Sequence, residues 1–229
     1  MEFTLLFAAL TGFAGVWLAV RLLSATGRIP PGIERPTDLL VGAALIGLVA
    51  GRLAAMIGDG INPITNPGDA LIVRAGVDTG IASVAAIGAL VWSTRDRLPE
   101  AIDALAPAGL AGLAGWQAGC LWRGTCLGTP SDLPWAWALT DGGVDRHPTE
   151  LYAALLLAVA AVAVARLPSR PWLPTATALM AAAGVRLVTQ PIRPSLTGGP
   201  TIWYAVGVIV GASVVGWSLR RRDAPAAPG

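Results

Sequence analysis

The sequence contains few charged residues and no lysine. Only 13% of its 229 residues are charged, whereas water-soluble domains carry roughly 25% charged residues, and 54% are hydrophobic. This composition points to a membrane protein. No lysine is present, so all 16 cationic residues are arginines, and the net charge is only +2. Such a small and scattered charge excludes a nucleic-acid binder, so we expect no nucleic acid among the partners.

Metal-binding side chains are equally scarce. The two cysteines, Cys120 and Cys126, are separated by five residues, which does not match a redox or zinc CxxC spacing. His147 is the only histidine, so a second pair of ligands is missing. We therefore expect neither a metal site nor a cofactor. The two thiols can form one disulfide on an oxidising face of the membrane or pack as small apolar groups.

Apolar runs fill most of the chain. We expect helical spans at about residues 3–23, 39–57, 80–92, 102–122, 151–165, 173–188 and 202–219. Some are shorter than the roughly 20 residues that a perpendicular span needs, which polar ends drawn into a water-filled cavity would explain. The sequence therefore predicts an all-α polytopic membrane protein with about seven transmembrane helices. Residues 1–222 would form a single domain, and residues 223–229 a disordered tail.

Arginine placement predicts the orientation of these spans. When alternate connections are assigned to opposite sides, ten arginines fall on one side and four on the other, with Arg52 and Arg186 inside helices. By the positive-inside rule the ten mark the cytoplasmic side. We therefore expect the N-terminus outside, the C-terminus in the cytoplasm and the polar loop 123–147 on the outer face.

Small residues and buried charges give further expectations. Gly47 with Gly51, and Gly115 with Gly119, form GxxxG pairs that let helices approach closely in lipid. A charge within a span costs about 3 kcal/mol on insertion scales, so it should have a partner or face a polar cavity. Asp103, near the cytoplasmic start of the fourth span, should simply be solvated.

Arg186 and Arg193 lie seven residues apart, two helical turns if the helix continues. Pro191 and Pro194 break the helix there, so the backbone around Arg193 should be irregular. Guanidinium groups near the outer membrane surface suit a lipid phosphate, which they bind bidentately. The alternative is an internal Arg–Asp pair that holds the bundle together, and it stays open for Arg52 and Arg186 in particular.

Three segments, in order, resemble the prolipoprotein diacylglyceryl transferases. GCLWRGTCLGTPSDLPW, which begins at Gly119, is similar to their signature loop, approximately RIGCFLAGCCYGRPTDLPW in one branch. RHPTELY, from Arg146 to Tyr152, is similar to RHPTQLYE, and the segment from Arg186 to Arg193 matches the spacing of a late R-x-x-x-E-F-F-R.

The chain also departs from these motifs. The signature arginine is replaced by Gln117, the late glutamate by Gln190 and the acidic position of the loop by Thr125. The early HGG or YGG segment reads Asp78-Thr79-Gly80, so the histidine proposed for it is missing. Fold and lipid binding survive such changes more easily than chemistry does.

The resemblance implies a multi-pass enzyme of the bacterial plasma (inner) membrane with its site facing the outer side. It would move a diacylglyceryl group from phosphatidylglycerol, or a similar anionic phospholipid, to the thiol of a lipoprotein signal-peptide cysteine. Its partners would be that lipid, the prolipoprotein signal peptide and the surrounding membrane lipids. The alternative is a catalytically impaired relative that binds lipid or a partner membrane protein.

The resemblance also implies roles for individual residues. Arg193 is the candidate for stabilising the phosphate leaving group, and Asp78, Glu150 or His147 for the base. Histidine ordinarily exchanges a proton near neutral pH, although His147 can equally cap the fifth span. The neighbouring tryptophans suit an interfacial aromatic belt. The candidates for substrate binding are Arg52, Arg123, Gly128, Arg146, Arg186 and Tyr152.

Overall fold

The computed structural model describes residues 4–33, 35–66, 68, 76–123, 126–138, 143–193 and 201–221, except the side chains of 4–6, 79, 122 and 123. The predicted tail, 223–229, lies outside the described residues. The chain divides into two compact units, one of Met1–Pro30 with Asp103–Gly229 and one of Pro31–Ile102. The prediction of a single domain over 1–222 stays a prediction.

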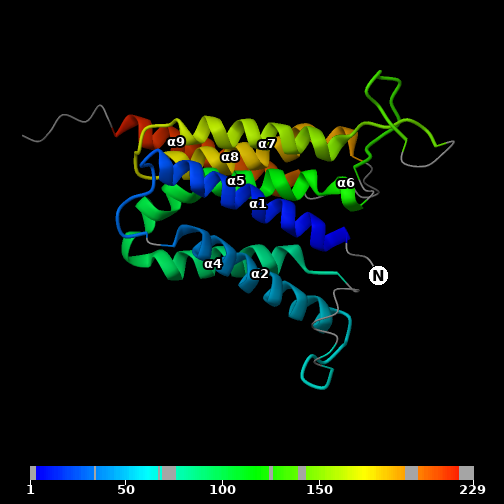
Figure 1. The fold of residues 1–229 in the computed structure, drawn as a ribbon, viewed down its shortest axis with the longest axis horizontal. Coiled ribbons are helices and arrows are strands. Elements are labelled where there is room, and N and C mark those ends of the chain that lie inside the picture. The colour runs from blue at the N-terminus through cyan, green and yellow to red at the C-terminus, as the bar shows by residue number, and fades with distance from the viewer. Residues whose placement is uncertain are drawn as a thin grey trace, which may run out of the picture. The chain divides into compact units, whose positions relative to one another are not determined.

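Helices make up both units (Figure 1). The first unit contains α1 (Thr4–Ala25), most of α5 (Leu98–Ala118), α6 (Cys120–Arg123), α7 (Thr149–Ala165), α8 (Leu173–Thr189), η3 (Gln190–Ile192) and α9 (Thr201–Arg220). The second contains α2, α4 and η2, at Pro36–Gly58, Thr79–Thr94 and Arg95–Arg97. In the described residues each of the seven predicted apolar segments coincides with a long helix, and no strand is present.

Within the described residues, three helices are long and apolar enough to cross a membrane: Phe7–Ala25 of α1, α2 and α9. α7 is shorter but apolar on every side. Its buried face carries Ala153 and Leu157, whereas Leu155 and Val159 are exposed. A helix that is apolar all round is either buried in a large core or set in lipid. The exposed face of α7 is therefore suited to a bilayer.

The core of the first unit lies where α5, α7 and α8 meet. It is built mostly from alanine, with larger side chains between: Leu110, Ala114, Ala153, Leu157, Ala161, Val164, Ala178 and Val185. Small residues also bring α9 against α8, because a Cβ on Gly211 would come within 2.8 Å of the Ala176 carbonyl oxygen. The packing is therefore the close backbone approach that lipid-embedded helices use.

The two predicted GxxxG pairs are confirmed as close contacts. In the second unit, Gly47 and Gly51 face the backbone of α4 at Ala82 and of Asp78 just before it. In the first unit, Gly119 lies against Ala8 of α1, and Gly115 against the carbonyl of Thr11. A side chain at any of these positions would separate the paired helices.

One end of the first unit is held by bonds between helix ends. Arg28, after α1, donates to the carbonyl oxygen of Leu167, after α7, at 2.8 Å. Ser218, near the end of α9, donates to the carbonyl oxygen of Pro171 at 3.3 Å. The N-terminus of α1 and residues 126–138 and 143–148 lie at the opposite end (Figure 1). The first end is called the basic end below, because it carries Arg21, Arg28, Arg166, Arg170, Arg220 and Arg221.

The expectation that Asp103 is solvated is wrong. Asp103 is only 9% exposed, and it binds the start of α8. Its Oδ2 accepts from the Trp172 backbone N–H at 2.6 Å, and its Oδ1 accepts from the backbone N–H of Thr175 at 3.0 Å and from the Thr175 hydroxyl. The first N–H groups of a helix have no partner within the helix. Asp103, which lies in α5, supplies an acceptor for these N–H groups of α8. No local sequence pattern could indicate this contact.

We expect Asp103→Asn to lower the stability of the protein by about 1–2 kcal/mol. Asparagine keeps only one of the two acceptor oxygens and turns an N–H₂ toward a backbone donor. The apparent Tm in detergent, measured by thermal unfolding, should fall clearly. Asp96→Asn is the control, because the Asp96 side chain is 93% exposed, and it should leave the Tm unchanged. Equal effects of the two substitutions would contradict the capping role.

Candidate functional site

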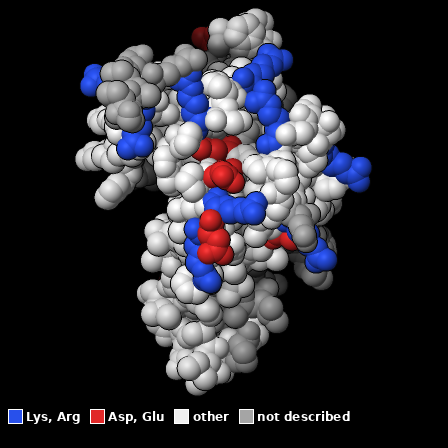
Figure 2. Space-filling view, turned by 90° about the vertical axis from the view of Figure 1, so that its left-hand side faces the viewer, with Lys and Arg blue, Asp and Glu red and all other residues white. Residues whose placement is uncertain are grey.

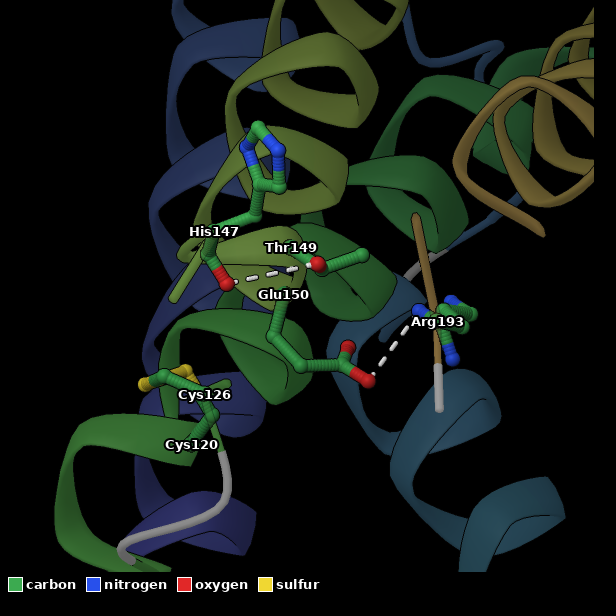
Figure 3. The surroundings of a disulfide bond; sticks show 6 residues. All are labelled: Cys120, Cys126, His147, Thr149, Glu150 and Arg193. Carbon is green, nitrogen blue, oxygen red and sulfur yellow. Dashed lines mark hydrogen bonds and ion pairs between the residues drawn. A yellow bond between two sulfur atoms is a disulfide. The ribbon is translucent and has the colours of Figure 1, made fainter. Parts of the chain in front are cut away.

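A disulfide anchors the polar segment that follows α5. Cys120 and Cys126 are bonded and fully buried, closing a turn around the short helix α6 (Figure 3). Of the two states left open by the sequence, the structure has the disulfide. The bond fixes the start of residues 126–148 against the end of α5.

Backbone hydrogen bonds then tie this segment to two other parts of the first unit. The Gly128 N–H donates to the His147 carbonyl at 2.7 Å, and the His147 N–H donates to the Thr129 carbonyl at 3.1 Å. The Thr129 N–H donates to the Ile192 carbonyl at 2.9 Å. The segment therefore passes between the start of α7 and the end of η3.

Gly128 lies at the closest point of this contact. A Cβ at Gly128 would overlap the Thr149 hydroxyl and the carbonyl oxygen of Ile192. Thr149 is buried and donates to the same Ile192 carbonyl at 3.2 Å. Only glycine fits this position, so Gly128 has a packing role. Its predicted contact with substrate stays a prediction.

Gln117, Glu150, Arg186 and Arg193 form a polar network beside this contact, and Thr189 supports it. Arg193 Nη2 lies 3.0 Å from Oε1 of Glu150, and the Arg193 Nε donates to the Thr189 hydroxyl at 3.4 Å. We assign the Gln117 amide the orientation that satisfies its neighbours. Its nitrogen then donates to Oε2 of Glu150 at 2.5 Å, and its oxygen accepts from the two Nη atoms of Arg186 at 2.7 and 3.0 Å.

This network is shielded from solvent. Gln117 is 3% exposed, and the Arg193 and Glu150 side chains are 20% and 18% exposed. Two guanidinium groups and one carboxylate leave one net positive charge among these residues. A charge held in low-dielectric surroundings attracts a counter-charge more strongly than it would in water. The network can therefore hold an anion.

Three helix ends bring these side chains together. Gln117 lies in the last turn of α5, Glu150 in the first turn of α7, and Arg186 in the last turn of α8. The chain then passes through η3, which contains Pro191, and Arg193 is extended with φ −90° and ψ 138°. The predicted irregular backbone at Arg193 is confirmed. Since Pro191 ends α8, Arg193 turns back toward Glu150.

The aromatic residues of the site form a separate group. The indole N–H of Trp135 donates to the Tyr152 hydroxyl at 2.7 Å, and the Tyr152 ring lies edge-on to His147 with centroids 6.2 Å apart. Figure 3 shows the imidazole turned away from the Glu150–Arg193 pair. Within the described residues the buried Nδ1 of His147 has no hydrogen-bond partner. Arg146 donates to the Gly128 carbonyl at 3.2 Å.

Arg52 and Asp78 are in the second unit. Arg52 is 5% exposed and donates to the Gly76 carbonyl at 3.1 Å. Asp78 caps the start of α4, where its carboxylate accepts from the Ile81 N–H at 2.9 Å. The Arg123 side chain lies outside the described residues. The site thus joins Glu150, Arg186 and Arg193 of the predicted set.

Sequence reasoning missed Gln117 and Thr189 as members of the site. Gln117 entered only as a departure from a motif, yet it bridges Glu150 and Arg186. Its position, three residues before Cys120 in a span otherwise apolar, was the available signal. Thr189 is 2% exposed and supports Arg193. No pattern marks this threonine, because its role depends on the break at Pro191.

An all-helical architecture with apolar outer faces and a shielded, charged network at helix ends defines a class, the helical membrane proteins that hold a polar site. The particular family follows from comparison with known proteins. The prolipoprotein diacylglyceryl transferase family matches residues 3–219. The chain belongs to this family, as its motifs predicted.

Two curated relatives carry the name phosphatidylglycerol–prolipoprotein diacylglyceryl transferase. The protein of Solidesulfovibrio magneticus is 31% identical over 158 residues, which cover 64% of this chain and 58% of the relative. The protein of Rhodospirillum centenum is 34% identical over 178 residues, which cover 72% of this chain and 63% of the relative. The chain therefore spans about three fifths of the length of these relatives.

We expect the Cys120→Ser, Cys126→Ser double variant to remain folded but less stable. In the chain-entropy account, a short disulfide loop stabilises a protein by about 2 kcal/mol. The apparent Tm in detergent should fall accordingly, whereas phosphatidylglycerol binding should persist, because neither sulfur belongs to the network. Loss of lipid binding in a protein that still unfolds cooperatively would contradict this separation.

Proposed function

We propose that this protein is a membrane-embedded transferase that moves a diacylglyceryl group from phosphatidylglycerol to the thiol of a lipoprotein signal-peptide cysteine. The observation that carries the proposal is the network of Gln117, Glu150, Arg186 and Arg193. The names of the two curated relatives and the family membership support the choice of donor and acceptor.

The donor's phosphate is the group that the network would bind. A phosphodiester carries one negative charge, which matches the one net positive charge of the two arginines and Glu150. Guanidinium groups bind phosphate oxygens bidentately, with a geometry that an ammonium group lacks. Arg193, whose side chain is 20% exposed, is our candidate for the direct contact, because both Nη atoms of Arg186 are already bound by Gln117. Arg186, fixed by Gln117, would support it.

The reaction would be a displacement at carbon. The acceptor cysteine must lose its thiol proton, since the thiolate is the nucleophile. Its sulfur forms a bond to the glycerol carbon of the diacylglyceryl group, and the bond from that carbon to the phosphate oxygen breaks. Negative charge then gathers on the departing glycerol phosphate. Arg193 would stabilise that charge, as preorganised cations do at developing anions.

Glu150 is better suited to positioning Arg193 than to accepting the thiol proton. Both of its oxygens are occupied, one by Arg193 and the other by Gln117. An ion pair of this kind fixes the direction of the guanidinium group. Asp78, Glu150 and His147 stay candidates for the proton acceptor, and the supporting roles of Arg52, Arg123, Arg146 and Tyr152 also stay predictions.

A second candidate function rests on the departures from the family motifs. Gln117 replaces the signature arginine, and Asp78 stands where the early histidine is expected. A protein with these changes could bind phosphatidylglycerol or a partner membrane protein without transferring the lipid group. Binding with no transfer to a signal peptide, and no rescue of a strain depleted of its own transferase, would favour this candidate.

We also propose a topology of seven membrane spans with the N-terminus outside and the C-terminus in the cytoplasm. Reporter fusions after Arg97 and Arg170 should report a cytoplasmic position, and one after Thr140 an external position. The arginine distribution supports this arrangement by the positive-inside rule. It would place the network at the outer side of the bacterial plasma membrane. The opposite reporter pattern would put the network on the wrong side for a secreted signal peptide.

We expect Arg193→Ala to reduce transfer about 10²–10³-fold, the usual cost of removing one preorganised charge stabiliser. Arg193→Lys keeps the charge but not the planar pair of donors, so its loss should be clear but smaller. The measurement is the mass increase of a synthetic signal peptide incubated with phosphatidylglycerol and purified protein.

Arg166→Ala is the matched control for Arg193, because Arg166 is exposed at the basic end. It removes the same charge from the opposite end of α7 and should leave transfer unchanged. Near-normal transfer by Arg193→Ala would overturn the anion assignment. A loss of equal size in Arg166→Ala would instead indicate a general effect of charge on membrane association.

A further inference from the structure

An apolar groove lies at the basic end of the first unit, away from the network. Trp172, Ser213, Val214 and Trp217 line an open groove of about 420 Å³ between the start of α8 and the last turns of α9. Small-molecule sites generally measure roughly 300–1,000 Å³. The groove is therefore large enough for part of a lipid.

The backbone at Trp172 is held in an unusual conformation beside this groove. Trp172 has φ 68° and ψ −6°, in the left-handed region that bulky residues rarely adopt. The buried carboxylate of Asp103 accepts from its backbone N–H at 2.6 Å. Strained backbone persists only where the surroundings fix it. Asp103 therefore holds the residue whose indole lines the groove.

A cation lies at the edge of the groove. The Arg221 guanidinium group stacks on the Trp217 ring, 3.9 Å from its centroid. Stacking uses the face of the guanidinium plane and leaves its N–H donors at the edge available to an anion. Arg220 precedes Arg221 in the sequence. Figure 2 shows several arginine side chains, drawn in blue, on the face turned to the viewer.

We propose that this groove binds an anionic phospholipid, with an acyl chain against Trp172, Val214 and Trp217 and the phosphate at Arg221. The surface next to the groove favours a lipid over a water-soluble anion. Going back along α9, Ile209 and Val210 are 64% and 46% exposed, as expected for a helix face turned to lipid. The ligand thus needs both an apolar chain and a negative head group.

This site is distinct from the network of Gln117, Glu150, Arg186 and Arg193. Trp172 immediately precedes α8 and Arg186 lies in its last turn. Since a 17-residue helix rises about 25 Å, the two sites lie at opposite ends of α8. The lipid of the groove is therefore not the donor of the proposed reaction.

The chain offers a matched control for the stacked arginine. Arg21 stacks on Trp17 of α1, 4.7 Å from the ring centroid, and also lies at the basic end. Trp17 does not line the groove. Replacing Arg21 removes the same kind of charge and the same kind of stacking without touching the proposed site.

The test measures phosphatidylglycerol binding to the purified full chain in a neutral detergent, by native mass spectrometry. Every protein carries Arg193→Ala, which removes the donor site proposed above. Adding Arg221→Ala should weaken the remaining affinity about fivefold, as expected for one arginine facing an anionic head group. Ser213→Trp, at an exposed position, should fill the groove and lower the affinity further. Arg21→Ala should leave it unchanged.

Each other outcome has a defined meaning. Equal losses of affinity for Arg221→Ala and Arg21→Ala would contradict lipid binding in the groove. They would indicate a general attraction of the lipid to the basic end. Unchanged affinity in Ser213→Trp would also contradict the proposed site, and so would phosphatidylcholine binding as tightly as phosphatidylglycerol. Failure of the proposed donor site would appear separately, as an unchanged number of bound lipids when Arg193→Ala is introduced into the natural chain.

Discussion

The site depends on one carboxylate, that of Glu150, which contacts the Arg193 guanidinium group directly and is linked to Arg186 through the Gln117 amide. Without Glu150, the network would keep two positive charges and no carboxylate, in surroundings that water reaches poorly. Breaking a buried pair by removing one partner costs several kcal/mol, because the remaining charge stays uncompensated. Gln117 lets one carboxylate serve both arginines, since its amide connects Glu150 to Arg186. The ends of α5, α7 and α8 are therefore bound together by polar contacts rather than by apolar packing alone.

The neighbouring backbone depends on the same arrangement. Thr149 immediately precedes Glu150 and donates to the Ile192 carbonyl, while Arg193 immediately follows Ile192. The Glu150–Arg193 pair thus joins the two chain segments between which Gly128 passes. The disulfide between Cys120 and Cys126 fixes the other end of this stretch. A shift of Arg193 would therefore disturb the packing of Gly128 as well as the charge of the site.

The sequence was informative where the physical signal is local. Apolar runs predicted the seven long helices, small-residue pairs predicted two close helix contacts, and Pro191 predicted the irregular backbone before Arg193. The signal fails where a partner comes from a distant segment. Asp103 was predicted to be solvated, yet it caps α8 from another helix and binds Trp172, 69 residues away in the sequence. Gln117 was interpreted only as the replacement of a motif arginine, yet its amide joins Glu150 to Arg186.

Two departures from the family motifs concern the position of a carboxylate. In the motifs that the chain resembles, position 150 is glutamine and position 190 is glutamate, whereas this chain has Glu150 and Gln190. Each pattern thus has one carboxylate at these two positions, and in this chain it pairs with Arg193. In this chain the carboxylate at position 150 gives Arg193 a charge partner, an arrangement compatible with the anion binding proposed for the site.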